Sequence, residues 1–344
     1  MKTLSIVVPS YNVEKYLERC LISLLDENII DDIEVIIVND GSKDNTIKIA
    51  NEYKQKYPNT IKVIDKENGG HGSAINSGIK EATGKYCKVL DSDDWFNVDD
   101  FANFVNDLKK LDVDLVVTNY TRELVYSGES FLFKYKNMEY EKIYNFDEFN
   151  FEKLKLDYFF MATSTFKTSI LKHNDVVLDE KMFYVDMEFV IFPIKYINNF
   201  IYLDYDIYRY FIGRSDQSVS SASMVKNRKN HEAVLKRLIN FYENEDLSET
   251  KKKYIFNILQ QMLNTHYIIY CSYTRIDKKQ KYEIKDFDKY LLEKSPTLYQ
   301  KCNDKAFIRW NRRTKFRFAS TKRQLFTRLF NAYEIKYLYR KYSK

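Results

Sequence analysis

The sequence lacks the features of a small secreted or metal-stapled protein. Its four cysteines lie far apart, and no two of them form a CxxC pair. This spacing argues against a zinc ribbon and against a disulfide framework, so we expect core thiols in a reducing compartment. The apolar run before Pro9 is too short for a signal peptide or a membrane span. We therefore expect residue 1 to begin the folded domain.

Glycine and proline are also scarce, with eight and four residues in a chain of 344. Six of the eight glycines lie between residues 41 and 84, which predicts sharp turns or close approach to a ligand in that segment. Beyond residue 225 the only proline is Pro296, and helical spacing dominates. We expect a separate helical region there, divided into two pieces near Pro296.

Charge is distributed unevenly along the chain. The net charge is +6, yet residues 301–344 hold fourteen Lys or Arg and only two acids. The body is therefore mildly acidic and the tail strongly basic. Such a tail favours a polyanionic partner, either nucleic acid or anionic lipid. Apolar side chains recur on one face of residues 325–337, as in a basic amphipathic helix that lies on a membrane or packs on preceding helices.

The first 120 residues alternate short apolar runs with amphipathic stretches. Strands are predicted at 4–8, 34–38, 61–64, 86–90 and 114–118, with helical stripes in the first three intervals. This order predicts a mostly parallel, Rossmann-like α/β sheet flanked by helices, with ligands at the carboxyl ends of the strands. Further on we expect a hairpin at 127–128, helices near 147–156 and 187–196, and strands at 200–204 and 207–212. The predicted domains are 1–220, for catalysis, and 225–344, the helical region.

Acidic side chains follow two of these strands. Asp40 ends the second strand, and Pro9 and Tyr11 end the neighbouring one, where an aromatic ring and a carboxylate could bind a flat polar base. Asp-Gly is also a common turn pair, which is the structural alternative for Asp40.

Three carboxylates close the fourth strand, within the sequence DSDD that begins at Asp91. Their mutual repulsion is costly unless a cation or strong donors neutralise it. Hard oxygen ligands of this kind suit Mg²⁺ or Mn²⁺ shared with substrate phosphates. Alternatively, Asp93 and Asp94 cap the helix that follows.

The segments VVPSYN, VNDGSKDNT, NGGHGSAINSGIKEATGKY and VLDSDDW resemble, in this order, the family 2 glycosyltransferases of the GT-A fold. The resemblance covers roughly residues 1–120, with weaker echoes to about residue 220. It implies an inverting transferase that uses a nucleotide-activated sugar, most often UDP-linked, and a divalent metal. It assigns Asp40 to the nucleotide base, Asp91 to the ribose and Asp93 to the metal. The nucleotide-sugar site implied by the resemblance also includes Pro9, Tyr11, Asn68, Gly70, His71 and Ser92.

One departure from the family concerns Ile75. Many members have Ala-Arg-Asn where this chain has Ala-Ile-Asn, so a basic contact near the nucleotide is absent or supplied elsewhere. Arg209 and Arg214 lie in a segment that resembles the arginine-containing segment after the catalytic domain of bacterial relatives. They are predicted to contact the diphosphate, and pairing with carboxylates of the sheet is the alternative. His71, between glycines at a helix start, is suited to an anion contact.

Inverting transfer also needs a base that takes the proton of the acceptor hydroxyl. Asp186 matches the second position of the family's Glu-Asp element, whose first position is Val185 here. A helix-capping role is the alternative for Asp186, and Glu188 is the competing base.

The leading hypothesis is therefore a metal-dependent glycosyltransferase that moves a sugar to a glycan or lipid-linked acceptor in bacterial surface polysaccharide synthesis. The alternative is a non-catalytic sugar- or lipid-binding protein on a degenerate transferase scaffold. A dinucleotide-dependent oxidoreductase lacks its GxGxxG after the first strand, and no nucleic-acid-binding motif supports a nucleic-acid partner. We expect a cytoplasmic enzyme whose residues 301–344 contact the inner face of an anionic membrane.

Overall fold

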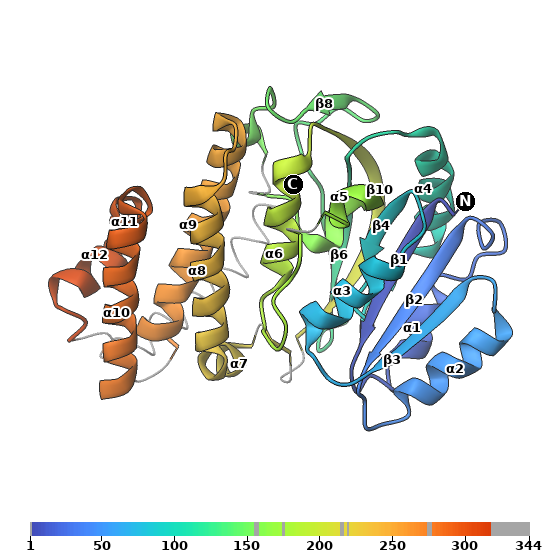
Figure 1. The fold of residues 1–344 in the computed structure, drawn as a ribbon, viewed down its shortest axis with the longest axis horizontal. Coiled ribbons are helices and arrows are strands. Elements are labelled where there is room, and N and C mark those ends of the chain that lie inside the picture. Colours follow the sequence, from blue (N-terminus) through green and yellow to red (C-terminus); the bar gives the residue numbers. More distant parts are fainter. Residues whose placement is uncertain are drawn as a thin grey trace. The chain divides into compact units, whose positions relative to one another are not determined.

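The computed structural model describes residues 2–154, 158–173, 176–213, 217–218, 220–273 and 277–317. The chain divides into two compact units, Met1–Ile212 and Gly213–Lys344. Figure 1 traces these units in chain order from blue to red.

Within the described residues, the first unit holds one mixed sheet of ten strands, in the order β3-β2-β1-β4-β9-β6-β10-β5, with β7 beside β6 and β8 beside β10. The pairs β1–β2, β2–β3, β1–β4 and β6–β10 are parallel. Strands β1 and β2 are buried along their whole length, as expected for a parallel sheet covered on both faces. The bounds are β1 Leu4–Ser10, β2 Ile33–Asp40, β3 Ile61–Lys66, β4 Tyr86–Val89, β5 Trp95–Phe96, β6 Leu115–Leu124, β7 Ser130–Phe133, β8 Ile143–Asn145, β9 Ser164–Lys167 and β10 Asn199–Ile212.

Helices of this unit pack on the sheet and use the apolar stripes seen in the sequence. Helix α3 packs on β1 and β2 (Figure 1), and Gly78 permits this because a Cβ there would overlap the side chain of Val7. The helices are α1 Leu17–Ile22, α2 Thr46–Lys56, α3 His71–Glu81, α4 Val98–Lys110, α5 Thr168–Leu171 and α6 Asp186–Ile191, with short 3₁₀ helices at Phe151–Lys153, Met161–Thr163 and Phe192–Tyr196.

The sequence predictions for the first 120 residues are confirmed, because each expected strand and helix is present. The hairpin is confirmed too, since β6 and β7 pair antiparallel around Gly128, whose φ is +67°. The two strands predicted at 200–204 and 207–212 form one strand, β10, whose register against β6 shifts on either side of Asp206.

The helix predicted near 147–156 is wrong within the described residues, where only the 3₁₀ turn Phe151–Lys153 forms. Three aromatic rings explain the difference. Phe146, Phe149 and Phe151 all pack on Phe200 of β10, with ring centroids 5.9, 5.1 and 6.0 Å from it. A regular helix would not direct positions separated by three and then two residues to one ring. Tertiary burial therefore overrides the local pattern.

The second unit is helical, as predicted. Its described helices are α7 Ser221–Lys226, α8 Arg228–Asn244, α9 Glu249–Cys271, α10 Lys278–Lys294, α11 Pro296–Cys302 and α12 Ala306–Arg313. Pro296 is the first residue of α11, so it does separate two helices, and its missing N–H is tolerated in a first turn. Across the whole chain all four cysteines are free and buried, as expected.

Candidate active site

The carboxyl ends of parallel strands bring the predicted site residues to one edge of the sheet. Asp40 is the last residue of β2, and Asp91 follows the end of β4 by two residues. Pro9 lies inside β1, opposite Val38, and Tyr11 just beyond β1 is 50% exposed. The strand order therefore gathers these residues as the sequence predicted.

The carboxylate of Asp40 holds the glycine-rich loop before α3. It accepts hydrogen bonds from the backbone N–H of Gly69 at 2.9 Å and of Gly70 at 2.7 Å, and from Lys66 Nζ at 3.0 Å. The side chain of Asn68 donates to the Asp40 carbonyl oxygen at 2.9 Å. Gly70 has a φ of +85°, a conformation that glycine adopts without strain. Asp40 thus shapes the loop from which α3 starts.

His71 begins α3 and points toward the end of β4. Its Nε2 lies 3.6 Å from Asp91 Oδ1. Burial lowers the pKa of His71, while the charges of Asp186, Asp93 and Asp40 raise it. Burial and the charge of Asp93 raise the pKa of Asp91 to about 7. The imidazole therefore sits among carboxylates from β2, the turn after β4 and α6.

Asp186 is the first residue of α6. Burial raises the pKa of its carboxyl, the charge of His71 lowers it and the charge of Asp91 raises it. The side chain therefore lies within electrostatic range of the His71–Asp91 pair, although 95 residues of sequence separate Asp186 from Asp91.

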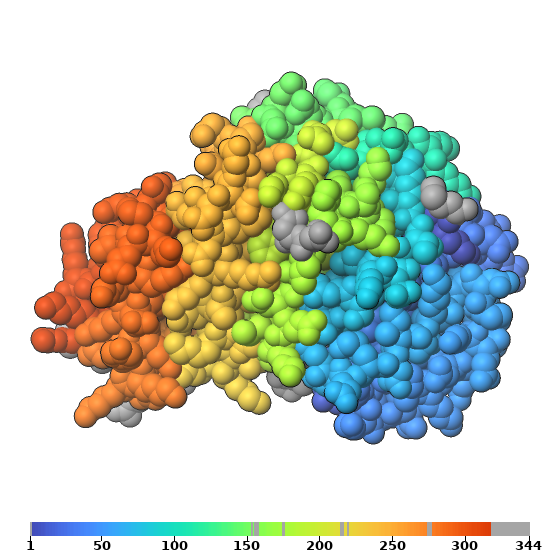
Figure 2. All heavy atoms as spheres, viewed as in Figure 1, coloured from blue at the N-terminus to red at the C-terminus, as the bar shows by residue number. Residues whose placement is uncertain are grey.

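The segment before α6 is attached to α3. The side chain of Asn76 donates to the Leu178 carbonyl at 2.9 Å and accepts from the Leu178 N–H at 3.0 Å. The backbone N–H of Lys181 donates to the Gly69 carbonyl at 2.5 Å, and a Cβ on Gly72 would overlap the carbonyl of Asp179. In Figure 2 the yellow-green surface around α6 adjoins the light-blue surface of α3. These contacts fasten the segment that leads to Asp186 to α3 and to the loop before it.

Glu188, the competing base, occupies a different environment. Its side chain is fully buried, and its Oε2 accepts the backbone N–H of Asp179 at 2.7 Å. Its carboxylate therefore stabilises the segment that leads to Asp186, whereas Asp186 is only partly buried. The geometry favours Asp186 as the group that can meet a substrate.

The turn from Asp91 to Asp94 is fixed from two sides. Arg19 of α1 donates from Nη2 to the Asp93 carbonyl oxygen at 2.8 Å. The buried carboxylate of Asp94 accepts from Tyr208 Oη and from the Phe211 N–H, both at 2.7 Å. Ser92, which precedes Asp93 in the same turn, is buried. Asp94 thus ties the turn to β10, while the side chains of Asp91 and Asp93 remain partly exposed.

Two arginines were predicted to contact the diphosphate, and the structure describes only Arg209. Arg209 lies in β10 and pairs with Glu123 at 3.0 Å and with Asp206 at 2.9 Å. This is the carboxylate pairing that the sequence left open as the alternative. Arg214 lies outside the described residues, as do residues 325–337 of the basic stripe.

The donor set fits a divalent cation that shares its ligands with a substrate. In the part of the chain that the structure describes, no group of three or more His, Cys, Asp or Glu side chains could hold a metal ion alone. Mg²⁺ and related ions bind proteins through one or two carboxylates and complete their coordination with phosphate oxygens and water. Asp93 would supply the carboxylate, and the repulsion that raises the pKa of Asp91 would be relieved by the same cation.

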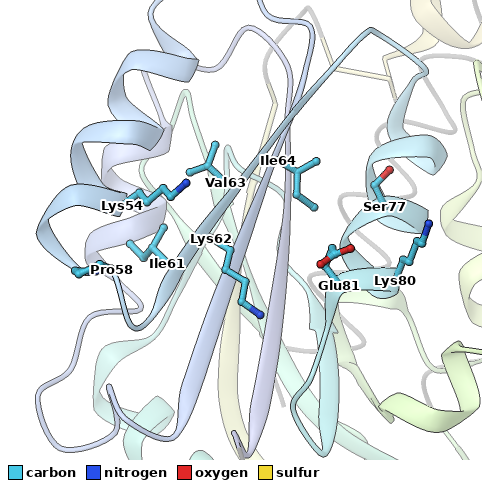
Figure 3. Close-up of a pocket in the computed structure, with 9 residues that line it drawn as sticks. All are labelled: Lys54, Pro58, Ile61, Lys62, Val63, Ile64, Ser77, Lys80 and Glu81. Carbon is cyan, nitrogen blue, oxygen red and sulfur yellow. The ribbon is translucent and has the colours of Figure 1, made fainter.

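A separate hollow of about 500 Å³ lies along the edge strand β3 (Figure 3). Lys54 and Pro58 border it on one side, and Ser77, Lys80 and Glu81 of α3 on the other. None of the predicted site residues lines it. The described helices include none that is both long and apolar enough to cross a membrane.

Sequence reasoning missed the residues that position the site. Arg19 and Tyr208 act through hydrogen bonds that join distant segments. Glu188 was expected only as a competing base, and its hydrogen bond from Asp179 gives it a positioning role instead. Asn76 was noted only beside the Ile75 departure, although its amide holds the Asp186 segment. Long-range pairing leaves no local pattern, so nothing in the sequence distinguishes Arg19 from other polar helix residues.

Comparisons with known proteins show which proteins this chain resembles. A sequence profile described as Glycosyl transferase family 2 matches residues 5–174. Minor teichoic acid biosynthesis protein GgaB of Bacillus subtilis is 43% identical over 115 residues, which cover 33% of this chain and 13% of GgaB. Poly(ribitol-phosphate) beta-glucosyltransferase of Bacillus spizizenii is 28% identical over 274 residues, which cover 77% of this chain and 40% of the relative. The chain thus spans less than half the length of both relatives.

Solved structures share the fold. S. aureus TarS 1–349 in complex with UDP-GlcNAc superposes with a TM-score of 0.60 at 21% identity, covering 87% of this chain and 83% of that chain. Mannosyltransferase PcManGT from Pyrobaculum calidifontis, in complex with GDP-Man and Mn²⁺, gives 0.53 at 14% identity and covers 87% of this chain and 82% of that chain. These likenesses confirm the expected GT-A fold.

Proposed function

Because this chain is a member of glycosyl transferase family 2, we propose that it moves a sugar from a UDP-linked donor to a hydroxyl of a bacterial surface polymer, with inversion at the anomeric carbon. The observation that supports this proposal is the His71–Asp91 pair, 3.6 Å apart at the carboxyl edge of the sheet, whose charges act on the Asp186 carboxyl. The UDP-GlcNAc bound to TarS supports the donor. The names of the Bacillus relatives support a surface polymer as acceptor.

In this proposal Asp186 accepts the proton of the acceptor hydroxyl as its oxygen attacks the anomeric carbon. The new bond to the acceptor oxygen forms on the face opposite the bond that breaks to the diphosphate, and UDP leaves. Burial raises the pKa of Asp186, which makes its carboxylate a stronger base than an exposed aspartate. General-base assistance of this kind contributes about 10²- to 10⁴-fold in rate.

The donor would lie across the strands that carry Asp40 and Asp91. Asp40 and its glycine loop border the nucleotide, and Asp91 meets the ribose. His71 and the N-terminus of α3 face the same edge, where a helix end stabilises an anion. Mn²⁺ or Mg²⁺ held by Asp93 would offset the negative charge of the leaving diphosphate, and the Mn²⁺ in the PcManGT complex supports that choice.

The experiment is a panel of nucleotide sugars incubated with the full chain and Mn²⁺, in which release of the nucleoside diphosphate is measured. Asp99→Asn, a change of one exposed aspartate in α4, is the matched control for Asp186→Asn. We expect one UDP-sugar to be consumed by the wild type and by Asp99→Asn. No turnover and no thermal stabilisation with any nucleotide sugar would favour a non-catalytic binding protein instead.

A further inference from the structure

Arg122 on β6 carries a charge that no described residue neutralises. No hydrogen bond or ion pair from its guanidinium to any residue that the structure describes is present, and its Nε is buried. The group lies 4.6 Å from the ring centroid of Phe133 and 5.9 Å from that of Tyr120. A partly buried cation without a counter-charge is costly, although the aromatic faces offset part of that cost.

Strands β6 and β10 do supply carboxylates to another arginine, Arg209. Arg209 of β10 pairs with two of them, Glu123 and Asp206. Arg122 is in register with Tyr210, and Arg209 is in register with Thr121. Because successive side chains of a strand point to opposite faces of the sheet, Arg122 lies on the face opposite to Glu123. Carboxylates of the protein thus neutralise Arg209, whereas Arg122 pairs with no described carboxylate and can bind an external anion.

Tyr210 joins Arg122 to the candidate active site. Burial raises the pKa of Tyr210, as do the charges of Asp94 and Asp91, while the charge of Arg122 lowers it. The phenol of Tyr210 therefore interacts electrostatically with Arg122 and also with Asp91 and Asp94. Among the described residues its hydroxyl makes no hydrogen bond, so a phenol donor and a guanidinium stand side by side on neighbouring strands.

A row of aromatic rings leads from Arg122 toward Asp186, and its first member, Tyr120, is buried. The ring of Tyr120 lies 5.7 Å from that of Phe160, and Phe160 lies 4.3 Å from Tyr158. Tyr158 Oη then reaches the sulfur of Met187, the residue after Asp186, at 4.0 Å. Phe160 and Tyr158 are partly exposed, so the carbon faces of a sugar or polyol could pack on them.

We propose that Arg122 and Tyr210 bind a phosphate group of the acceptor, whose chain runs along Phe160 and Tyr158 toward Asp186. Arginine suits this role because its planar fork contacts two phosphate oxygens at once. Strands β6 and β10 lie beyond β4 and β9 from β1, β2 and β3. Strands β1, β2 and β3 adjoin the Asp40 loop, which borders the donor in the proposed function. An anion bound at Arg122 therefore belongs to the acceptor. This inference rests on the proposed function.

The test uses ribitol 5-phosphate as the probe and ribitol as its uncharged counterpart, titrated calorimetrically into the full chain saturated with UDP and Mn²⁺. UDP is titrated separately into each protein. The variants are Arg122→Gln, Arg122→Lys and Tyr210→Phe. Lys134→Gln is the matched control, because Lys134 follows β7 and is already paired with Asp204 at 2.8 Å.

We expect Arg122→Gln to bind the probe about tenfold to a hundredfold more weakly than the wild type while its affinity for UDP is unchanged. Arg122→Lys should retain part of the affinity, Tyr210→Phe should lose a few-fold, and Lys134→Gln should match the wild type. Ribitol should bind more weakly than its phosphate. Unchanged UDP affinity also shows that Arg122→Gln is folded.

Two results would overturn the inference alone. Equal probe affinity in Arg122→Gln and the wild type would remove Arg122 from the acceptor site. A parallel loss of UDP affinity would assign the arginine to the donor diphosphate. A wild-type protein that binds neither UDP nor the probe would instead contradict the proposed function, so the two failures are distinguishable.

Discussion

The guanidinium of Arg19 lies 3.7 Å from the ring centroid of Trp95, stacked on the residue that ends the acidic turn. Phe211 of β10 covers the same guanidinium, with its ring centroid at 4.4 Å. Arg19 also donates to the carbonyl of Asp93. One side chain of α1 therefore connects the acidic turn to the last residues of β10.

Arg19→Met should weaken Mn²⁺-dependent UDP binding about tenfold, because the Asp93 carbonyl loses a charge-assisted hydrogen bond and the turn is freer to move. Arg19→Lys should recover part of that affinity. The measurement is calorimetric titration of UDP with and without Mn²⁺, and exposed Lys48→Met in α2 is the control. A loss of equal size without Mn²⁺ would show that Arg19 acts on the fold rather than on Asp93.

Asp93→Ala should abolish sugar transfer and leave the unfolding temperature near that of the wild type, because it removes an oxygen ligand and no core volume. Excess EDTA should reproduce the loss in the wild-type protein. The readouts are nucleoside diphosphate release and thermal unfolding, with Asp99→Asn as control. Full wild-type activity in EDTA would contradict the metal role.

Buried Glu34 predicts a pH-dependent contribution to stability. Although burial raises its pKa, hydrogen bonds from Lys62, Ser5 and Thr83 lower it to about 2. At a pH above 4.5, the ordinary pKa of a glutamate, the ionised Glu34 carboxylate therefore stabilises the fold. This stabilisation is lost as the pH falls from about 4.5 to about 2. Lys62 is half exposed, so solvent screens part of the effect and we expect about 2 kcal/mol at pH 7.

Glu34→Gln tests this by urea unfolding at pH 7 and at pH 3. The variant should be less stable than the wild type at pH 7, and the difference should shrink at pH 3. Exposed Glu52→Gln in α2 is the control. A difference independent of pH would assign the stability of Glu34 to packing.

The basic C-terminal segment, residues 301–344, should bind anionic membranes. Arg312 of α12 pairs with Asp288 at 2.8 Å and stacks on Tyr299 at 3.6 Å, so this residue serves the helical unit. A full-length variant with Lys322→Glu, Arg323→Glu and Arg328→Glu should lose binding to anionic liposomes, since each basic residue near such a surface contributes roughly 1 kcal/mol. Added salt should weaken the wild-type attachment. Co-sedimentation that ignores lipid charge would reject this role.

The sequence predicted the sheet edge well because strand order and local signals coincide there. Asp40 and Asp91 directly follow apolar strands, so parallel pairing alone brings them together. Asp186 and Glu188 could not be distinguished, because both lie in the first turn of one helix and only packing shows that Glu188 is fully buried. The paired state of Arg209 and the unpaired state of Arg122 likewise depend on neighbouring strands.

Measurement of turnover and UDP affinity in the same Asp186→Asn protein decides whether Asp186 is the base. We expect a loss of turnover of about 10²- to 10⁴-fold with unchanged UDP affinity. Glu188→Gln should instead lower the unfolding temperature, because its carboxylate holds the Asp179 N–H. Near-normal turnover in Asp186→Asn, together with an inactive but folded Glu188→Gln, would contradict the account.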